Sequence, residues 1–121
     1  MRKKYLIRML CVGVLLTFAL SLSCAYAADN PQRIEITAKQ FEFMPSEITV
    51  KKGEPVELVI KSADVAHGLR VNGLNIDAKV PAGGTTTAQF TANKTGDFSG
   101  HCSTFCGKGH GKMKFKVHVV D

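Results

Sequence analysis

Two thiols, an imidazole and a thioether fall within twelve residues near the end of the chain. The stretch from Cys102 to Met113 reads CSTFCGKGHGKM, which places Cys106 and His110 between them at intervals of four. Thiolate and thioether sulfur favour copper(I), while imidazole binds copper in both of its common oxidation states. Residue types and spacing together predict a copper site that can gain or lose one electron.

A ligand from a distant part of the chain is also expected, and His67 at the end of the run DVAH is the strongest candidate. In a turning loop, Cys102 and Cys106 can bring two sulfurs close enough to bridge a pair of metal ions. His110 and Met113 would complete the coordination from the far end of that loop. A rigid scaffold with loops at one end can gather such side chains around a point.

Other interpretations of the same residues stay open. Cys102 and Cys106 could form a structural disulfide in an exported protein, but so short a loop constrains the unfolded chain little. One copper could be held by His67, Cys106, His110 and Met113, as in blue-copper proteins, which leaves Cys102 without a role. Zinc is disfavoured because thioether sulfur is a poor zinc ligand.

The remaining soft or titratable candidates receive other roles. His118 alternates with apolar residues in a strand-like run, so we expect it to face solvent. His101 directly precedes Cys102, and we expect it to be a neighbour of the ligands or a surface residue. Met44 is expected to fill the core.

The elements that would position the site are β-strands. Alternating apolar and polar residues mark 33–38, 48–51, 56–60 and 115–119, shorter strands are expected at 69–71, 74–76 and 96–100, and 85–91 is rich in β-formers. Turn sequences such as NG at 72–73 and PAGG at 81–84 separate them. Seven or eight short strands without a helical period predict an all-β Greek-key sandwich or barrel.

Residues 1–27 are predicted to be a signal peptide. A basic start at 2–4, an apolar run over 10–22 and AYA at 25–27 have the layout of a secretory leader. Cleavage after Ala27 would leave one domain at 28–121, exported and without a membrane span. Two alternatives stay open: an uncleaved anchor, because the apolar run is at the short end of what spans a bilayer, and a lipid-modified Cys24.

Charge is nearly balanced once the leader is set aside. The leader holds four of the 16 basic residues and no acidic residue, so 12 basic and 10 acidic residues remain. A net charge of about +2 speaks against a nucleic-acid binder. Lys108 and Lys112 flank His110 and could steer an acidic partner. The glycines at 107, 109 and 111 would either let that partner approach or only permit tight turns.

The pattern DVxH followed by CxxxCxxxHxxM resembles the dinuclear copper-A (CuA) centre of cytochrome c oxidase subunit II, which nitrous oxide reductase shares. ITVKKG at 48–53 and DAKVPAG at 77–83 extend the resemblance over nearly all of the chain after the leader. The resemblance implies a cupredoxin fold. By position, Cys102 and Cys106 would bridge two copper ions, and His67 and His110 would each bind one of them.

The same resemblance assigns two weak ligands. Met113 would bind the copper held by His67, and the backbone carbonyl of Thr104 would bind the other copper. The oxidase subunit usually has glutamate where this chain has Thr104. Because the ligand is a carbonyl oxygen, the exchange would affect the tuning of the site more than metal binding.

The resemblance implies a non-enzymatic carrier of single electrons, with no catalytic residue. Its partners would be respiratory redox proteins such as a c-type cytochrome or a terminal oxidase. The oxidase subunit has membrane helices before its copper domain and an aromatic residue near the site for electron entry. We identify neither in this sequence, which has no tryptophan, so we expect a free-standing periplasmic relative. A copper chaperone that delivers metal during oxidase assembly is the alternative.

Overall fold

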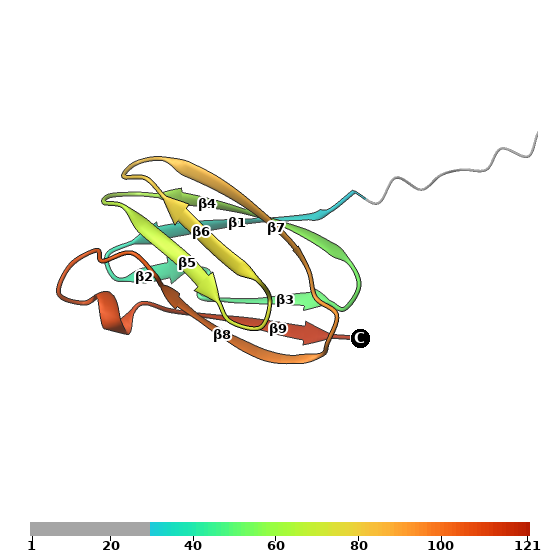
Figure 1. Ribbon diagram of the computed structural model, residues 1–121. Coiled ribbons are helices and arrows are strands. Elements are labelled where there is room, and N and C mark those ends of the chain that lie inside the picture. Colours follow the sequence, from blue (N-terminus) through green and yellow to red (C-terminus); the bar gives the residue numbers. More distant parts are fainter. Residues whose placement is uncertain (1–29) are drawn as a thin grey trace, which may run out of the picture.

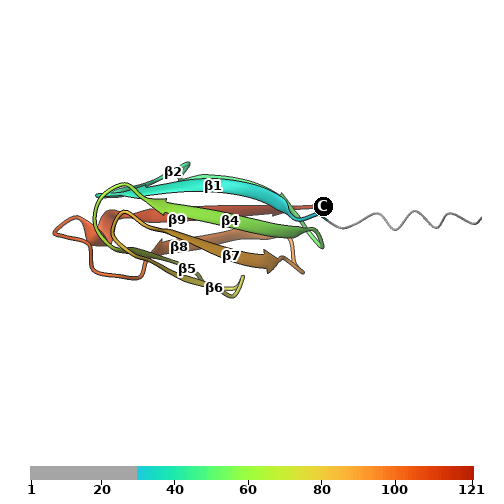
Figure 2. The ribbon, with the colours of Figure 1, turned by 90° about the horizontal axis from the view of Figure 1, so that it is seen from above.

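The computed structural model describes residues 30–121, which form two β-sheets packed face to face (Figure 1 and Figure 2). One sheet has the order β2-β1-β4-β7, and the other has the order β3-β9-β8-β5-β6. The predicted leader at 1–27 lies outside the described residues. The first sheet is built from β1 (Gln32–Lys39), β2 (Glu42–Met44), β4 (Pro55–Ser62) and β7 (Thr85–Thr91). The second is built from β3 (Glu47–Lys51), β5 (His67–Val71), β6 (Ile76–Val80), β8 (Gly96–Cys102) and β9 (Lys114–Val120).

The expected all-β sandwich is confirmed, with differences in two strands. Nine strands are present among the described residues, because β2 is only three residues long and is too short to show an alternating pattern. The strand expected at 74–76 instead runs over Ile76–Val80. Asn75 has a left-handed backbone with φ of 59°, so residues 72–75 form the turn and alternation begins after it.

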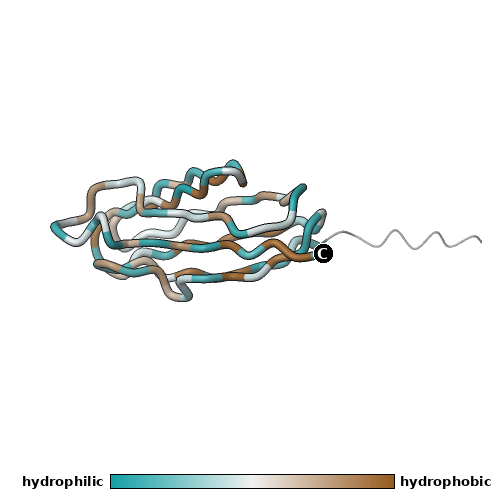
Figure 3. Tube along the Cα trace, turned by 90° about the horizontal axis from the view of Figure 1, so that it is seen from below, coloured by the Kyte–Doolittle hydropathy of each residue, from teal (hydrophilic) through white to brown (hydrophobic). Residues whose placement is uncertain are grey.

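Alternation along the strands builds the core between the two sheets. In β9, Phe115, Val117 and Val119 are buried, while the residues between them face outward. Figure 3 shows the same alternation of apolar and polar residues along the chain trace. The rings of Phe43 and Phe115 meet edge to face with centroids 5.7 Å apart. The core is therefore closed from both sheets near the end that carries the cysteines.

Four loops lie at the same end of the sandwich, which we call the ligand pole. They are residues 40–41, 63–66, 81–84 and 103–113. The carboxyl terminus and the turn at 72–75 lie at the opposite end (Figure 1). In the long loop, His110–Lys112 form one turn of 3-10 helix, η1. No helix within residues 30–121 has the length and apolar character needed to cross a bilayer.

Candidate metal centre

The sulfur and nitrogen atoms of the predicted site converge at the ligand pole. Cys102 Sγ lies 3.8 Å from Cys106 Sγ. Each sulfur faces one imidazole: His67 Nδ1 is 3.9 Å from Cys102 Sγ, and His110 Nδ1 is 3.6 Å from Cys106 Sγ. Met113 Sδ lies 3.8 Å from Cys106 Sγ. The structure thus brings together the five side chains that the sequence analysis selected.

The sixth predicted ligand is a backbone atom, and it lies in the same place. The thiol of Cys102 donates to the carbonyl oxygen of Thr104 at 3.1 Å. That oxygen points at the sulfur pair although the Thr104 side chain differs from the residue usual in oxidase subunits. The position of the carbonyl is set by the loop backbone and not by the side-chain type.

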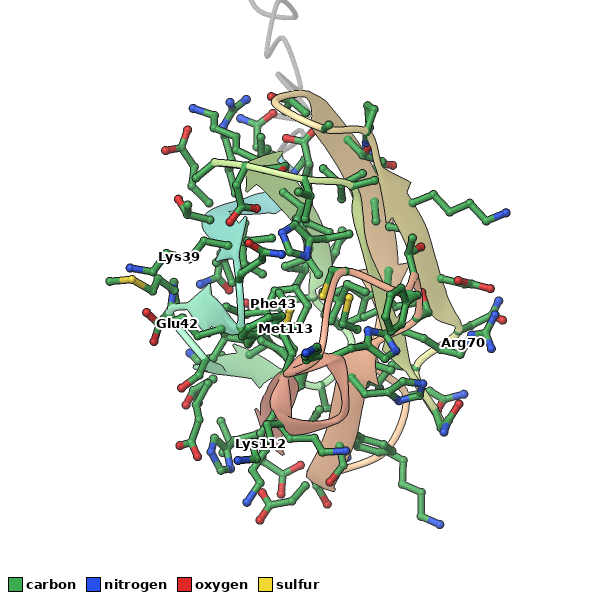
Figure 4. All side chains as sticks on the ribbon, turned by 90° about the vertical axis from the view of Figure 1, so that its left-hand side faces the viewer. Lys39, Glu42, Phe43, Arg70, Lys112 and Met113 are labelled. Atoms are coloured by element: carbon green, nitrogen blue, oxygen red, sulfur yellow. The ribbon has the colours of Figure 1, made fainter. Side chains whose placement is uncertain are left out.

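Most of this cluster is shielded from water. His67, Cys102, Cys106 and Met113 are buried, whereas His110 is half-buried at the surface of the pole. Figure 4 looks onto this pole, with Met113 and Phe43 in the interior and charged side chains such as Arg70 at the margin. The site therefore has a closed interior side and one edge, at His110, that reaches the surface.

Strand pairing explains why residues so far apart in sequence meet. β5 and β8 are antiparallel neighbours with Leu69 opposite Cys102, so the start of β5 and the end of β8 lie side by side. Ser103 N donates to Gly68 O at 3.1 Å, which ties the first residue after β8 to the start of β5. His67 at the first position of β5 consequently faces the cysteine loop.

The short η1 turn places the other two ligands. The N–H of His110 donates to the carbonyl of Gly107 at 3.1 Å, and the N–H of Met113 donates to the carbonyl of His110 at 3.2 Å. Cys102 N then donates to Met113 O at 3.1 Å, which closes the loop on itself. These bonds bring His110 and Met113 back to the sulfurs within eleven residues of Cys102.

Asp64 orients His67, a role that the sequence analysis did not assign. Its Oδ1 lies 2.6 Å from Nε2 of His67, so the second ring nitrogen, Nδ1, is left facing the sulfur pair. A carboxylate on the outer nitrogen fixes the tautomer of a ligand histidine and raises its basicity. The acidic residue three positions before the histidine in DVAH was the available signal.

The pKa of Asp64 is lowered from its ordinary value. Loss of solvation acts in the opposite direction and raises the pKa of this carboxyl group, but three hydrogen bonds outweigh it. They come from the backbone N–H of Gln40, the ring of His67 and the backbone N–H of Val65. The carboxylate is thus held in the charged form that best orients His67.

Gln40 connects the two halves of the site from the other sheet. Its backbone N–H donates to Asp64 Oδ2 at 2.8 Å, and its side-chain amide donates to the carbonyl oxygen of Cys106 at 2.5 Å. Nothing in the sequence pattern marks this residue. Its contact depends on the turn between β1 and β2 reaching over the cysteine loop.

An aromatic side chain packs on the cysteine loop, a contact that the sequence pattern did not predict. The ring of Phe41, 37% exposed, packs on the backbone at Gly107 and Gly109. A Cβ atom on Gly109 would come within 2.4 Å of this ring. Gly107 also has φ of +133°, a conformation that favours glycine. These two glycines therefore serve the packing and turning of the loop, while Gly111 faces open space.

The two cysteines are free thiols in the structure and do not form the disulfide considered above. The pKa of the Cys106 thiol is raised to about 11. Burial is the largest cause, and the hydrogen bond and the charge of Cys102 add to it. Thiolate is the form that binds metal, so metal binding here releases protons.

The donor set fits copper. Ligand atoms that sit about 2.0–2.3 Å from a shared metal ion in tetrahedral geometry are separated by about 3.3–3.8 Å, and the distances of 3.6–3.9 Å within this cluster lie close to that range. His67, Cys102 and Cys106 alone can offer three ligand atoms within 4.8 Å of one another. Two soft thiols with imidazole and thioether select copper over hard cations.

The other candidates of the sequence analysis lie away from this cluster. His118 faces outward as expected, but it is paired, with Nδ1 2.7 Å from Asp97 Oδ1 and Nε2 3.2 Å from Glu47 Oε2. His101 is a half-buried residue of β8 whose strand partner in β9 is Lys114, consistent with a surface role. The prediction for Met44 was wrong: it is 50% exposed, because β2 is an edge strand whose alternation turns Phe43 inward.

A two-sheet sandwich with a buried set of soft ligands in loops at one pole defines a class of copper-binding β-proteins. Residues 10–114 match the family of cupredoxin-like domains, and the chain belongs to that family. The predicted cupredoxin fold is confirmed by this match.

Known relatives agree with the resemblance seen in the motifs. The chain is 33% identical over 84 residues to cytochrome c oxidase subunit 2 of Thermus thermophilus, a match that covers 69% of this chain and 62% of the relative. The chain thus spans less than two thirds of that relative's length. The predicted resemblance to this oxidase subunit is confirmed.

Solved structures share the fold. The periplasmic domain of cytochrome oxidase subunit II (CoxB) of Bradyrhizobium japonicum superposes with a TM-score of 0.68 at 24% identity, over 74% of this chain and 84% of that domain. Auracyanin A, a blue copper protein of Chloroflexus aurantiacus, superposes with a TM-score of 0.61 at 19% identity, over 75% of this chain and 100% of that protein. At these identities the two structures support the fold alone.

Proposed function

We propose that this chain is an exported, periplasmic copper protein that carries single electrons between respiratory redox proteins, using a dinuclear copper centre of the CuA type. The observation that carries the proposal is the paired arrangement at the ligand pole. Two buried sulfurs lie 3.8 Å apart, and each has its own imidazole nitrogen, at 3.9 Å for Cys102 and 3.6 Å for Cys106. Such a set offers bridging thiolates and one histidine for each of two ions.

In this proposal, Cys102 and Cys106 bridge both ions, while His67 and His110 bind one each. Met113 and the carbonyl of Thr104 are the weak ligands. When bound, the copper pair supplies a one-electron couple, and the protein keeps the ligands in place. Asp64 and Gln40 hold the ligand loops by hydrogen bonds, which limits rearrangement as the charge changes.

Burial favours electron transfer over copper delivery. A chaperone has to release its metal to a partner, which requires ligands that the partner can reach. His67, Cys102 and Met113 are each at most 1% exposed. Copper held by these side chains can exchange only after the loop opens, whereas an electron can reach the site through its surface edge. No substrate bond is made or broken, so we assign no catalytic residue.

A mononuclear blue-copper carrier is the second candidate. It is supported by the fold shared with auracyanin A and by the presence of a histidine, a cysteine and a methionine around Cys106. It leaves Cys102, a buried thiol at 1% exposure facing His67, without a function. The dinuclear arrangement uses every ligand of the cluster.

The copper content and the electron paramagnetic resonance spectrum of the loaded protein test the proposal. We expect two copper ions per chain and a single unpaired electron whose hyperfine pattern has more lines than one copper nucleus can give. One copper per chain with the hyperfine pattern of a single nucleus would overturn the dinuclear assignment. Rapid loss of copper to a competing chelator, with no stable redox cycle, would instead support delivery.

A further inference from the structure

Exposed apolar side chains gather at the ligand pole. Among the described residues, five large hydrophobic side chains are exposed, and only Val120 lies at the opposite end of the sandwich. The other four, which we call the apolar rim, are Phe41, Met44, Val65 and Phe105. They come from the turn between β1 and β2, the end of β2, the loop before β5 and the cysteine loop. Exposed apolar side chains concentrated at one end of a molecule mark a candidate contact surface.

Phe105 is the most exposed member of the rim and lies beside the surface edge of the metal site. Its side chain is 77% exposed. Its ring centroid is 5.7 Å from that of His110, with the planes tilted by 49°. A large aromatic ring held in water at this level of exposure does nothing for the core. Aromatic side chains are among the residues that most often anchor protein interfaces by filling a pocket on the partner.

The charge around the rim is positive and unpaired. Lys108 and Lys112 are exposed on either side of His110, and neither forms an ion pair with the carboxylates of residues 30–121. The acidic residues nearest in the loops are engaged, since Asp64 binds His67 and Glu42 pairs with Lys39. Charge complementarity therefore calls for an acidic partner.

From these observations we infer that the ligand pole docks a one-electron metalloprotein with an acidic contact face, with Phe105 as the apolar anchor and Lys108 and Lys112 as the orienting charges. The inference rests on the proposed electron-carrier function and adds the chemistry of the partner. In the encounter, one electron passes between the bound copper and the metal of the partner, and no covalent bond forms or breaks.

Two other occupants fit the surface less well. A second copy of the chain, docked through the same pole, would place Lys108 and Lys112 against their own counterparts and would be repelled. An anionic lipid surface would attract the lysines and the rim, but it offers no redox centre to the His110 edge. Both are outcomes of the test below.

Binding can be measured separately from electron transfer. The 15N-labelled, copper(I)-loaded protein is titrated with a reduced acidic c-type cytochrome at about 10 mM ionic strength, where charges act over about 30 Å. Because both proteins are in their reduced forms throughout the titration, no electron is transferred and only binding is measured. We expect amide shifts confined to 40–44, 63–66 and 103–113, and a Kd that rises steeply with salt.

Matched variants show whether binding depends on the residues at the ligand pole or only on the net charge and the exposed apolar area of the whole protein. Lys108→Gln with Lys112→Gln should weaken binding roughly tenfold. Lys51→Gln with Lys94→Gln removes the same charge at the opposite end and should leave Kd nearly unchanged. Phe105→Ala should weaken binding, and Val120→Ala, another exposed apolar truncation, should not.

Equal Kd values for the two lysine pairs would overturn the inference. So would stronger binding of a basic cytochrome, self-association at the same pole, or binding to anionic vesicles in place of the acidic cytochrome. These results do not depend on the number of copper ions. A protein that docks the acidic cytochrome but gives a single-copper spectrum would contradict the proposed centre alone.

Discussion

Gln40 donates its side-chain amide to the carbonyl oxygen of Cys106 at 2.5 Å, across 66 positions of sequence. The same residue donates its backbone N–H to Asp64, which in turn contacts His67. One residue in the turn between β1 and β2 thus connects the histidine loop to the cysteine loop. The ligand pole is held together by contacts that lie outside the ligand set.

Loss of this connection should loosen the site. We predict that Gln40→Leu lowers stability by about 1 kcal/mol, because the Cys106 carbonyl loses its donor, which corresponds to a fall in Tm of about 4–8 °C. The visible absorption of the copper-loaded protein should shift as well. Gln89→Leu, at an exposed position of β7, is the matched control. An unchanged Tm and spectrum in Gln40→Leu would mean that the hydrogen bond has no influence on the site.

Gly109 and Gly111 should respond differently to the same substitution. A Cβ on Gly109 meets the Phe41 ring at 2.4 Å, while one on Gly111 meets nothing within 4 Å. We predict a loss of about 1–3 kcal/mol for Gly109→Ala and little change for Gly111→Ala, measured by chemical denaturation. Phe41→Ala should relieve most of the loss in the double variant. Equal effects at both glycines would contradict the packing of Phe41 on this loop.

Cys102→Ser tests the bridging role of the second thiol. A serine hydroxyl is a harder ligand than thiolate and does not bridge soft metal ions in the same way. We predict the loss of the electron paramagnetic resonance signal in which two copper ions share one unpaired electron. One copper should be retained at His67, Cys106 and His110. Ser103→Ala, a change in the same loop, should keep the original spectrum. A wild-type spectrum in Cys102→Ser would show that the assignment of Cys102 is wrong.

His118 should make stability depend on pH. Hydrogen bonds that the His118 ring donates to the carboxylates of Asp97 and then Glu47 raise its pKa above the ordinary 6.5, and these two residues come from the neighbouring strands β8 and β3. Because the folded pKa is raised, the stabilisation is fully present below the unfolded pKa and is lost as pH rises through the folded pKa. We predict that the Tm difference between wild type and His118→Gln shrinks as pH increases above about 6.5.

A second variant isolates the cause of this dependence. Asp97→Asn with Glu47→Gln removes both acceptor charges and should return the pKa of His118 towards its ordinary value, measured by NMR titration. A Tm difference that stays constant with pH would indicate that the two ion pairs do not form in solution.

The sequence by itself determined the fold class of this protein and its candidate ligands. The donors from Cys102 to Met113 lie in one loop, so their spacing alone limits what they can bind, and period-two alternation identifies strands because side chains in a strand point to opposite faces. Cys102 and Met113, eleven residues apart, were both found in this way. The resemblance to the oxidase subunit added the carbonyl of Thr104, which no side-chain pattern can reveal.

Only the tertiary structure decided which residues support those ligands and what surface surrounds them. The contact of Gln40 with Cys106, the packing of Phe41 on Gly109 and the exposure of Met44 depend on how the turn after β1 lies over the cysteine loop. That arrangement follows from the packing of two sheets against each other. Long-range placement of this kind leaves no periodic trace in the sequence, because each contact joins segments that are separate along the chain.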